Sequence, residues 1–345
     1  MNIQENVPLS GHSTMRLGGN ARYLTEVTSR SEIAEAVNWA IEHQVPPLMI
    51  GGGSNIFWRD EGFDGLVVVN NILGYDDKPQ ADGSHLITIG AGENWDKAVE
   101  KTVAAGLSGI EALSLIPGTA GATPVQNVGA YGQEIANVFV SLEAYDLHAR
   151  TFVTIEGKDC AFGYRSSRFK TTDRDRFLIA SITLRLHKQN PAPPFYQALT
   201  DYFEAHKITD FTPLAVRQAV IDIRSHKLPD PAKVANNGSF FANPIISEEL
   251  LTALVADYPD ITHWPAGPGM AKISAAWLID KAGFKDFHDN GPDGTGMATW
   301  PIQPLVLVNE SAKYTADLLR FKQKIINAVE AKFSIALEQE PELLP

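Results

Sequence analysis

The chain has 345 residues, of which 44% are hydrophobic and 20% charged, which is ordinary for a globular protein of two or three domains. The net charge of −12 argues against nonspecific nucleic-acid binding, which needs a basic surface. No apolar run approaches the roughly 20 residues that cross a bilayer, no basic and apolar leader is visible, and the histidines lack metal-ligand spacing. We therefore expect a cytoplasmic protein with no membrane partner, no nucleic acid and no metal.

The first part of the chain predicts an α/β unit. Ser29 and Glu32 form a capping-box pattern that starts a helix over residues 29–43. Short apolar runs at 48–50 and 66–69 are typical of buried strands. A helix followed by two such strands indicates alternating α and β elements.

Two glycine-rich segments follow, one at 51–55 and one at 116–132. The first, which we call the glycine turn, has neither the G-x-G-x-x-G spacing nor a Walker pattern, so alone it is weak evidence for a ligand. The second, which we call the cradle, holds four glycines among small and neutral polar residues. Its bare backbone N–H groups can form a concave anion site. We interpret the cradle as a phosphate or cofactor site, and the alternative is a long surface loop.

The middle of the chain predicts further strands and one helix. A strand at 86–89 leads into a helix that ends near residue 105, before a glycine. Strands at 141–147, 151–155 and 177–186 suggest a meander. The single cysteine, Cys160, excludes an internal disulfide, and we interpret it as a packed residue.

The last part of the chain predicts both helices and strands. A proline-rich stretch at 189–195 marks a loop or boundary, and Pro213 opens a helix that reaches about residue 225. Basic residues at the end of this helix act either as partners of the helix dipole or as a phosphate site. The remaining patterns predict helices at 247–257, 271–283 and 311–332 and strands at 305–308 and 333–337.

Ser239 lies between a glycine and two phenylalanines in a polar turn. No G-x-S-x-G pattern surrounds it, and no histidine and aspartate partners are evident. An acyl-transfer nucleophile is therefore not predicted.

Taken together, six motifs in order resemble the UDP-N-acetylenolpyruvoylglucosamine reductase family of bacterial peptidoglycan synthesis. They are Ile50–Ile56 (IGGGSNI), Ile116–Gly132 (IPGTAGATPVQNVGAYG), Phe162–Arg165 (FGYR), Lys227–Pro231 (KLPDP), Gly238–Pro244 (GSFFANP) and Ala276–Lys281 (AWLIDK). The resemblance covers nearly the whole chain. The proline-rich segment with Tyr196 is similar to the tyrosine loop of the family's longer type.

The resemblance implies an α+β protein with three parts. Two α/β subdomains, at 1–68 and 69–225, would make an FAD-binding unit of the p-cresol methylhydroxylase type, with residues 334–345 returning to the first. An α+β substrate-binding domain would occupy 226–333. We expect a monomer.

The resemblance also implies a reaction that reduces the enolpyruvyl ether of a UDP-sugar to UDP-N-acetylmuramate. The cofactor would be FAD, held noncovalently, since no histidine occurs at 46–60 to tether it there. NADPH would be the hydride donor and the UDP-sugar the substrate. Such an enzyme serves cell-wall biogenesis, and through it cell shape and division.

The family's motifs assign residues to roles. Arg165 resembles the arginine that binds the substrate carboxylate, Ser239 the proton donor, and Glu340 the glutamate that assists polarisation, with Glu342 as the alternative if Pro341 shifts the pattern. The residues expected to bind the substrate are Tyr164, Tyr196, Arg224, Lys227, Asn243 and Gln303. The residues expected to bind FAD are Gly51, Gly52, Gly53, Ser54, Asn55, Pro117, Gly118, Gly121, Ala122, Thr123, Gln126, Asn127 and Gly129.

Two rival hypotheses remain. One is a flavin oxidase of the same fold, against which the segments around Ser239 and Lys227 argue. The other is a non-catalytic nucleotide-sugar binding protein, which the presence of Arg165, Ser239 and a C-terminal glutamate disfavours.

Overall fold

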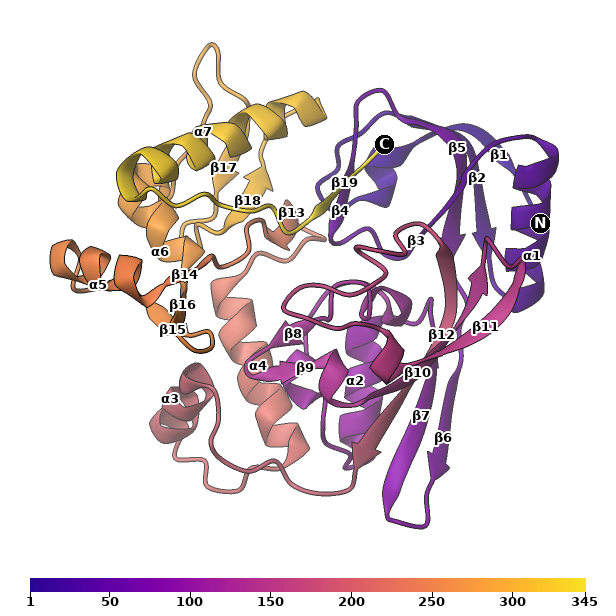
Figure 1. The fold of residues 1–345 in the computed structure, drawn as a ribbon, viewed down its shortest axis with the longest axis horizontal. Coiled ribbons are helices and arrows are strands. Elements are labelled where there is room, and N and C mark those ends of the chain that lie inside the picture. Colours follow the sequence, from indigo (N-terminus) through magenta and orange to yellow (C-terminus); the bar gives the residue numbers. More distant parts are fainter. The chain divides into compact units, whose positions relative to one another are not determined.

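The computed structural model describes all residues, 1–345, and the chain forms two compact units (Figure 1). The first unit comprises Met1–Val7, Ala21–Gly52 and Phe63–His226. The second unit comprises Pro8–Asn20, Gly53–Gly62 and Lys227–Pro345. The glycine turn thus begins in the first unit and ends in the second. No helix is long and apolar enough to span a membrane.

The first unit contains a four-stranded sheet in the order β1-β2-β5-β3. Strand β5 pairs in parallel with both β2 and β3. Helix α1 packs on this sheet through Ile33 and Val37, which lie in one core with Val27 and Leu66. The elements are β1 (Gln4–Pro8), β2 (Asn20–Val27), α1 (Arg30–Glu42), β3 (Pro47–Ile50) and β5 (Phe63–Asn70).

A second, antiparallel sheet in the first unit has the order β11-β10-β12-β7-β6. Helix α2 packs on it, and Trp95 at its start is buried and donates to the Leu113 carbonyl at 3.0 Å. The strands of this sheet are β6 (Tyr75–Pro79), β7 (Ser84–Gly90), β10 (Phe139–Asp146), β11 (Thr151–Glu156) and β12 (Phe177–His187). Helix α2 (Trp95–Ala104) and the short strands β8 (Gly129–Ala130) and β9 (Gln133–Glu134) lie between β7 and β10 in sequence. Short 3-10 helices occur at Glu111–Leu113, Ala120–Ala122, Ile135–Asn137 and Gly157–Asp159.

Helices α3 (Gln197–His206) and α4 (Pro213–Lys227) complete the first unit. They pack through a cluster that includes Phe203 and Val220. Arg217, itself 6% exposed, joins α4 to α2 by a two-pronged ion pair with Asp96 at 2.6 and 3.1 Å. An arginine buried in this way is stabilised only by its paired carboxylate.

The second unit is built on two small antiparallel sheets, β13-β18-β17 and β14-β16-β15, and a parallel pair of β4 and β19. The strands are β4 (Ile56–Trp58), β13 (Ala235–Ser239), β14 (Ile245–Ser247), β15 (His263–Pro265), β16 (Met270–Ile273), β17 (Met297–Thr299), β18 (Val306–Asn309) and β19 (Glu342–Leu344). The helices are a 3-10 turn (Leu9–His12), α5 (Glu248–Asp257), α6 (Ala275–Ile279), a π-helical segment (Asp280–Phe284) and α7 (Thr315–Phe333).

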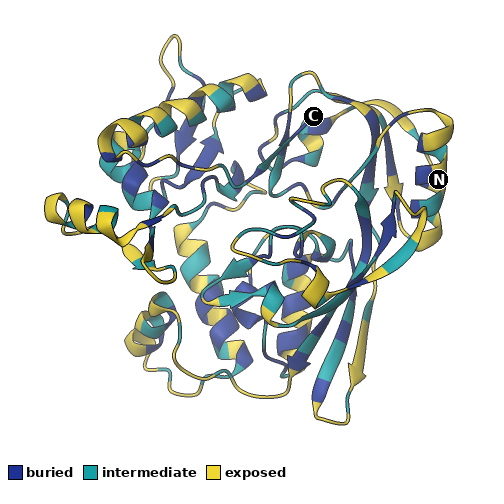
Figure 2. Cartoon of the chain, viewed as in Figure 1, coloured by how far each residue is buried: buried dark blue, intermediate teal, exposed yellow.

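Helix α7 organises the core of the second unit. Its apolar residues Leu318, Phe321 and Ile325 are fully buried, whereas its opposite face is exposed (Figure 2). Asp60 accepts from the backbone N–H groups of Thr315 and Ala316 at 2.6 and 2.9 Å, which satisfies two of the free donors at the helix start.

Most predicted elements are confirmed with small shifts at their ends, but the predicted meander is wrong, because β12 pairs with β10 rather than with β11. Ser29 caps α1 as expected, accepting from the Glu32 N–H at 3.3 Å. The helix predicted over 271–283 is wrong at its start, where residues belong to β16, and the strand predicted at 333–337 is absent. Helix α3, which follows the proline-rich stretch, was not predicted.

Candidate active site

In the first unit, the start of the glycine turn, Gly51 and Gly52, lies against the cradle. A Cβ added at Gly51 would come within 2.2 Å of the Thr119 hydroxyl oxygen, and one added at Gly52 would lie 3.3 Å from the Gly118 Cα. Gly118 has a φ of +115°, which disfavours any side chain there. Two segments far apart in sequence therefore form one backbone surface almost without side chains.

The segment that follows β7 hydrogen-bonds to the cradle and packs against it. The N–H of Trp95 donates to Gly118 at 3.0 Å, and the N–H of Gly121 donates to Ala91 at 2.9 Å. A Cβ at Gly121 would lie 2.5 Å from the Ala91 Cβ. Gly121 is thus required by packing inside the protein, and a substitution there would test the fold rather than a ligand contact.

Several polar groups of the cradle remain available. The Thr119 hydroxyl is buried and has no hydrogen-bond partner, and no backbone hydrogen bond uses the N–H of Gly118 or Thr119. By contrast, Thr123 donates to the Ala120 carbonyl at 2.7 Å, and the Asn127 amide binds Glu134 and Gly163. The side chains of Thr123 and Asn127 therefore support the structure of the cradle.

Arg165 lies beside the cradle. It sits in a tight turn closed by hydrogen bonds between Gly163 and Ser166 in both directions, at 3.0 and 3.2 Å. Its guanidinium donates to the Gly129 carbonyl at 2.8 Å and packs on the ring of Tyr164, which is 37% exposed. The backbone of Arg165 is left-handed, with φ +50°. The structure thus brings a cation and an exposed aromatic ring to the end of the cradle.

A third group in the first unit joins Tyr131, Tyr196 and Arg224. The two tyrosine rings meet edge to face with centroids 5.8 Å apart. Arg224 approaches the Tyr131 phenol and donates to the Leu115 carbonyl at 3.3 Å. Burial raises the pKa of both phenols, so both remain O–H donors at neutral pH. Tyr196 and Arg224 were predicted as site residues, whereas Tyr131 was not.

In the second unit, Ser239 ends β13. It pairs with Val306 on β18, and the next residue, Phe240, is fully buried and donates its N–H to Leu305 at 2.8 Å. The turn 300–303 before β18 places Gln303 near the same end of the sheet, since Val306 donates back to the Gln303 carbonyl at 2.9 Å. Ser239 and Gln303 therefore lie at the same end of this sheet.

The C-terminal glutamates occupy different places. The Glu340 N–H donates to the Phe240 carbonyl at 2.9 Å, and the Ala242 N–H donates to Glu338 at 2.9 Å. Glu342 instead begins β19 and donates its N–H to Asn55 at 2.9 Å. Glu340 is thus next to the segment of Ser239, and Glu342 is next to the glycine turn.

Two other predicted residues, Asn243 and Lys227, differ in their surroundings. The Asn243 side chain accepts from the Ala275 N–H at 2.9 Å and so supports the start of α6. Lys227 is exposed at the end of α4. Asn237, which was not predicted, donates to the Ser54 and Ile56 carbonyls at 3.3 and 3.1 Å and links the glycine turn to β13. No sequence pattern signalled that contact.

Comparisons with known proteins agree along the chain. Residues 21–153 match the model of an FAD binding domain, and residues 230–344 match that of the UDP-N-acetylenolpyruvoylglucosamine reductase C-terminal domain. The UDP-N-acetylenolpyruvoylglucosamine reductase of Ralstonia nicotianae is 40% identical over 342 residues, 98% of each chain. The enzyme of that name from Amoebophilus asiaticus is 39% identical over 345 residues, 100% of each.

A solved structure has the same fold. The UDP-N-acetylenolpyruvylglucosamine reductase of Thermus caldophilus superposes with a TM-score of 0.69 and 23% identity, covering 100% of both chains.

Proposed function

This chain belongs to the UDP-N-acetylenolpyruvoylglucosamine reductase family, and from that premise we propose that it reduces the enolpyruvyl ether of UDP-N-acetylglucosamine to UDP-N-acetylmuramate, with NADPH as hydride donor. It is a flavin-dependent oxidoreductase with an FAD-binding unit of the p-cresol methylhydroxylase type and an α+β fold. The full-length identity to the family's enzymes carries the proposal. The flavin oxidase and the non-catalytic binding protein are not favoured.

The residues of the cradle fit FAD. A backbone surface without side chains, an unpartnered Thr119 hydroxyl and unused N–H groups at Gly118 and Thr119 suit a pyrophosphate. We propose that these groups, with the rest of the glycine turn and the cradle, bind FAD noncovalently. The residues proposed to bind FAD are Gly51, Gly52, Gly53, Ser54, Asn55, Pro117, Gly118, Gly121, Ala122, Thr123, Gln126, Asn127 and Gly129.

We propose that Arg165 binds the carboxylate of the substrate. FAD bound in the cradle would supply hydride from NADPH to one vinyl carbon of the substrate, and negative charge would then develop on the other vinyl carbon and its carboxylate. A planar guanidinium suits this charge, because it can donate two parallel hydrogen bonds. Its place beside Gly129, at the end of the cradle, supports this role.

We propose that Ser239 donates a proton to the other vinyl carbon and that Glu340 is the acid that assists this protonation. A serine hydroxyl is a poor acid in water, so a fixed position and a polarising neighbour must supply the effect. The backbone bond between Glu340 and Phe240 supports this pairing.

The UDP-sugar needs cations and hydrogen-bond donors along its diphosphate. Arg224 with the phenol of Tyr196 forms such a group, and Lys227 adds an exposed ammonium at the end of the same helix. The residues proposed to bind the substrate are Tyr164, Tyr196, Arg224, Lys227, Asn243 and Gln303.

The domain division follows from the same proposal. We propose subdomains at 1–68 and 69–225, with 334–345 returning to the first, and a substrate domain at 226–333. The four-stranded and five-stranded sheets of the first unit support the first two, while residues 8–20, 53–62 and 334–345 cluster with the second unit. We also propose a monomer in the cytoplasm, where a lone buried thiol such as that of Cys160 stays reduced.

Thr119→Val tests the FAD cradle. It exchanges a hydroxyl without a protein partner for a methyl group, so the melting temperature should stay near that of the wild type. The FAD affinity should fall about 10- to 100-fold, the effect of losing a hydrogen bond to a charged group. Fluorescence titration of apoprotein with FAD measures this, and Thr88→Val, whose hydroxyl pairs with Thr183 on the sheet, is the matched control. Unchanged affinity in Thr119→Val would remove Thr119 from the site.

A turnover assay separates the proposed function from its rivals. Beyond the one equivalent that reduces the bound flavin, the purified protein should turn over NADPH only when the enolpyruvyl UDP-sugar is present, and UDP-N-acetylmuramate should accumulate in equal amount. An oxidase would consume NADPH with dioxygen alone. A binding protein would bind the sugar and leave NADPH unchanged.

A further inference from the structure

The segment 160–168, which we call the arginine loop, carries Arg165 and is closed at its base. The N–H of Arg168 donates to the Cys160 carbonyl at 2.9 Å, and its guanidinium donates to the Asp159 carbonyl at 3.0 Å. Arg165 therefore lies inside a closed loop of chain whose two ends are joined by Arg168.

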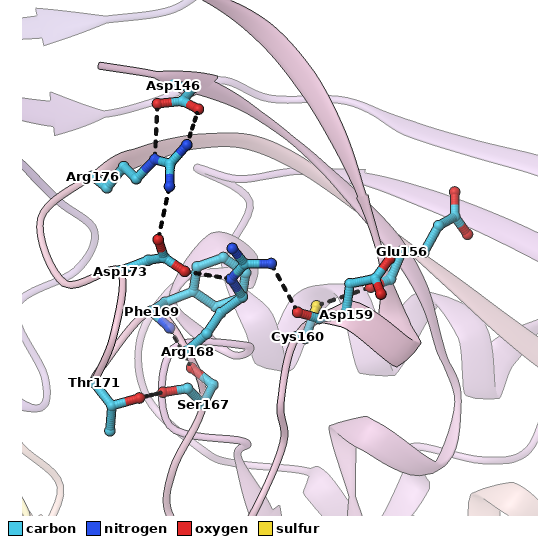
Figure 3. A network of polar contacts seen from close by, with 10 residues as sticks. All are labelled: Asp146, Glu156, Asp159, Cys160, Ser167, Arg168, Phe169, Thr171, Asp173 and Arg176. Atoms are coloured by element: carbon cyan, nitrogen blue, oxygen red, sulfur yellow. Dashed lines mark hydrogen bonds and ion pairs between the residues drawn. The ribbon is translucent and has the colours of Figure 1, made fainter. Parts of the chain in front are cut away.

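A chain of four charged side chains ties this base to the sheet (Figure 3). Arg168 pairs with Asp173 at 2.6 Å, and Asp173 pairs with Arg176 at 3.0 Å. Arg176 in turn makes two bonds, at 3.0 and 2.7 Å, to Asp146 at the end of β10. We call these four residues the charged chain.

Both acids of the charged chain are largely buried. The carboxylate of Asp146 is 5% exposed and that of Asp173 is 12% exposed. The hydrogen bond from Arg176 lowers the pKa of Asp146 to about 2, and Arg168 lowers that of Asp173. Both acids are therefore ionised at neutral pH, and removing the charge of Asp173 takes the paired carboxylate away from Arg168, while Arg176 keeps Asp146.

On its other side the arginine loop is bound to the cradle. The Ser167 hydroxyl, in a residue 1% exposed, donates to the Val125 carbonyl at 2.6 Å. The Asn127 amide donates to the Gly163 carbonyl at 3.0 Å. The loop is thus anchored to the sheet through the charged chain and to the cradle through Ser167 and Asn127.

This double anchor explains how Arg165 keeps its backbone. A left-handed conformation is unfavourable for a residue with a Cβ, and it persists where the surroundings fix it. We infer that the charged chain and Ser167 are positioning residues that hold Arg165 for the substrate carboxylate. The inference rests on the proposed role of Arg165.

Asp173→Asn tests the inference in both half-reactions of the holoenzyme. Flavin reduction by NADPH should keep its rate, because it does not involve Arg165. Anaerobic reoxidation by the enolpyruvyl sugar should slow about 10- to 100-fold, the effect of misplacing a substrate-binding group. The matched control is Asp175→Asn, which removes an exposed acid whose distance to Arg174 is 3.7 Å and should change neither rate.

The double variant Arg165→Ala, Asp173→Asn distinguishes positioning from other roles. If Asp173 acts through Arg165, the flavin of the double variant should be reoxidised as slowly as that of Arg165→Ala alone. Amide hydrogen exchange in peptides of the arginine loop should also quicken in Asp173→Asn. Ser167→Ala, which removes the anchor between the arginine loop and the cradle, should show the same pattern. It replaces Asp173→Asn as the test if Asp173→Asn does not fold.

Equal slowing of both half-reactions, a further loss in the Arg165→Ala background, or no loss at all would overturn the inference. Failure of the proposed function would look different, because the wild-type flavin would then not be reoxidised by the sugar. In that event, unchanged amide exchange in Asp173→Asn would still count against the positioning role.

Discussion

Replacing Ser239 with alanine is expected to slow reoxidation of the flavin by the enolpyruvyl sugar by about 10²–10⁴-fold, the contribution typical of a positioned acid. Reduction of the flavin by NADPH should stay close to the wild-type rate, because that half-reaction protonates no substrate carbon. Substrate affinity should change little, since the lost hydroxyl acts mainly in the transition state. Stopped-flow flavin absorbance follows both half-reactions.

The surroundings of Ser239 make this variant a clean test. The turn before it is fixed by Asn236, whose side chain accepts from the Gly238 N–H at 2.8 Å, and by a φ of +70° at Gly238. Neither device uses the serine hydroxyl, so alanine should preserve the turn and the melting temperature. Normal reoxidation in Ser239→Ala would remove Ser239 from the catalytic residues, and equal slowing of both half-reactions would indicate a structural role.

Glu340→Gln is expected to lower turnover by about 10²–10⁴-fold, whereas Glu342→Gln should change it little. The backbone of Glu340 is bonded to Phe240, next to Ser239, while that of Glu342 is bonded to Asn55. Both substitutions keep the size of the side chain and remove its charge, so each is the control for the other. Steady-state turnover with NADPH and the enolpyruvyl sugar is the measurement. The opposite ranking would move the assignment to Glu342.

Elements with strong local signals could be predicted from the sequence. Helix α1 begins where Ser29 indicates, and α7 has the buried face that its apolar spacing indicates. The segment 271–283 was misread because its first residues, which have apolar spacing consistent with a helix, pair in β16 between β14 and β15. Pairing with β15, which precedes β16 across a short turn, and with β14 further back in the chain outweighs the local apolar spacing.

In the candidate site, too, some parts could be predicted from local sequence and others depend on the folded chain. Composition indicated the cradle as a ligand site, and the glycine turn only weakly, because residues without bulky side chains allow close approach of a ligand. Their contact through Gly51 and Thr119 arises only in the folded first unit. The pairing of Arg176 with Asp146 likewise joins residues separated by a whole hairpin, and the place of Tyr131 beside Arg224 depends on how α4 packs.

The central claim is that this chain passes hydride from NADPH to an enolpyruvyl UDP-sugar through bound FAD. Anaerobic absorbance of the purified holoenzyme tests it most directly. The flavin band should bleach when one equivalent of NADPH is added and should return when the enolpyruvyl sugar follows, with UDP-N-acetylmuramate formed in equal amount. A band that stays bleached with the sugar and returns only with air would contradict the account.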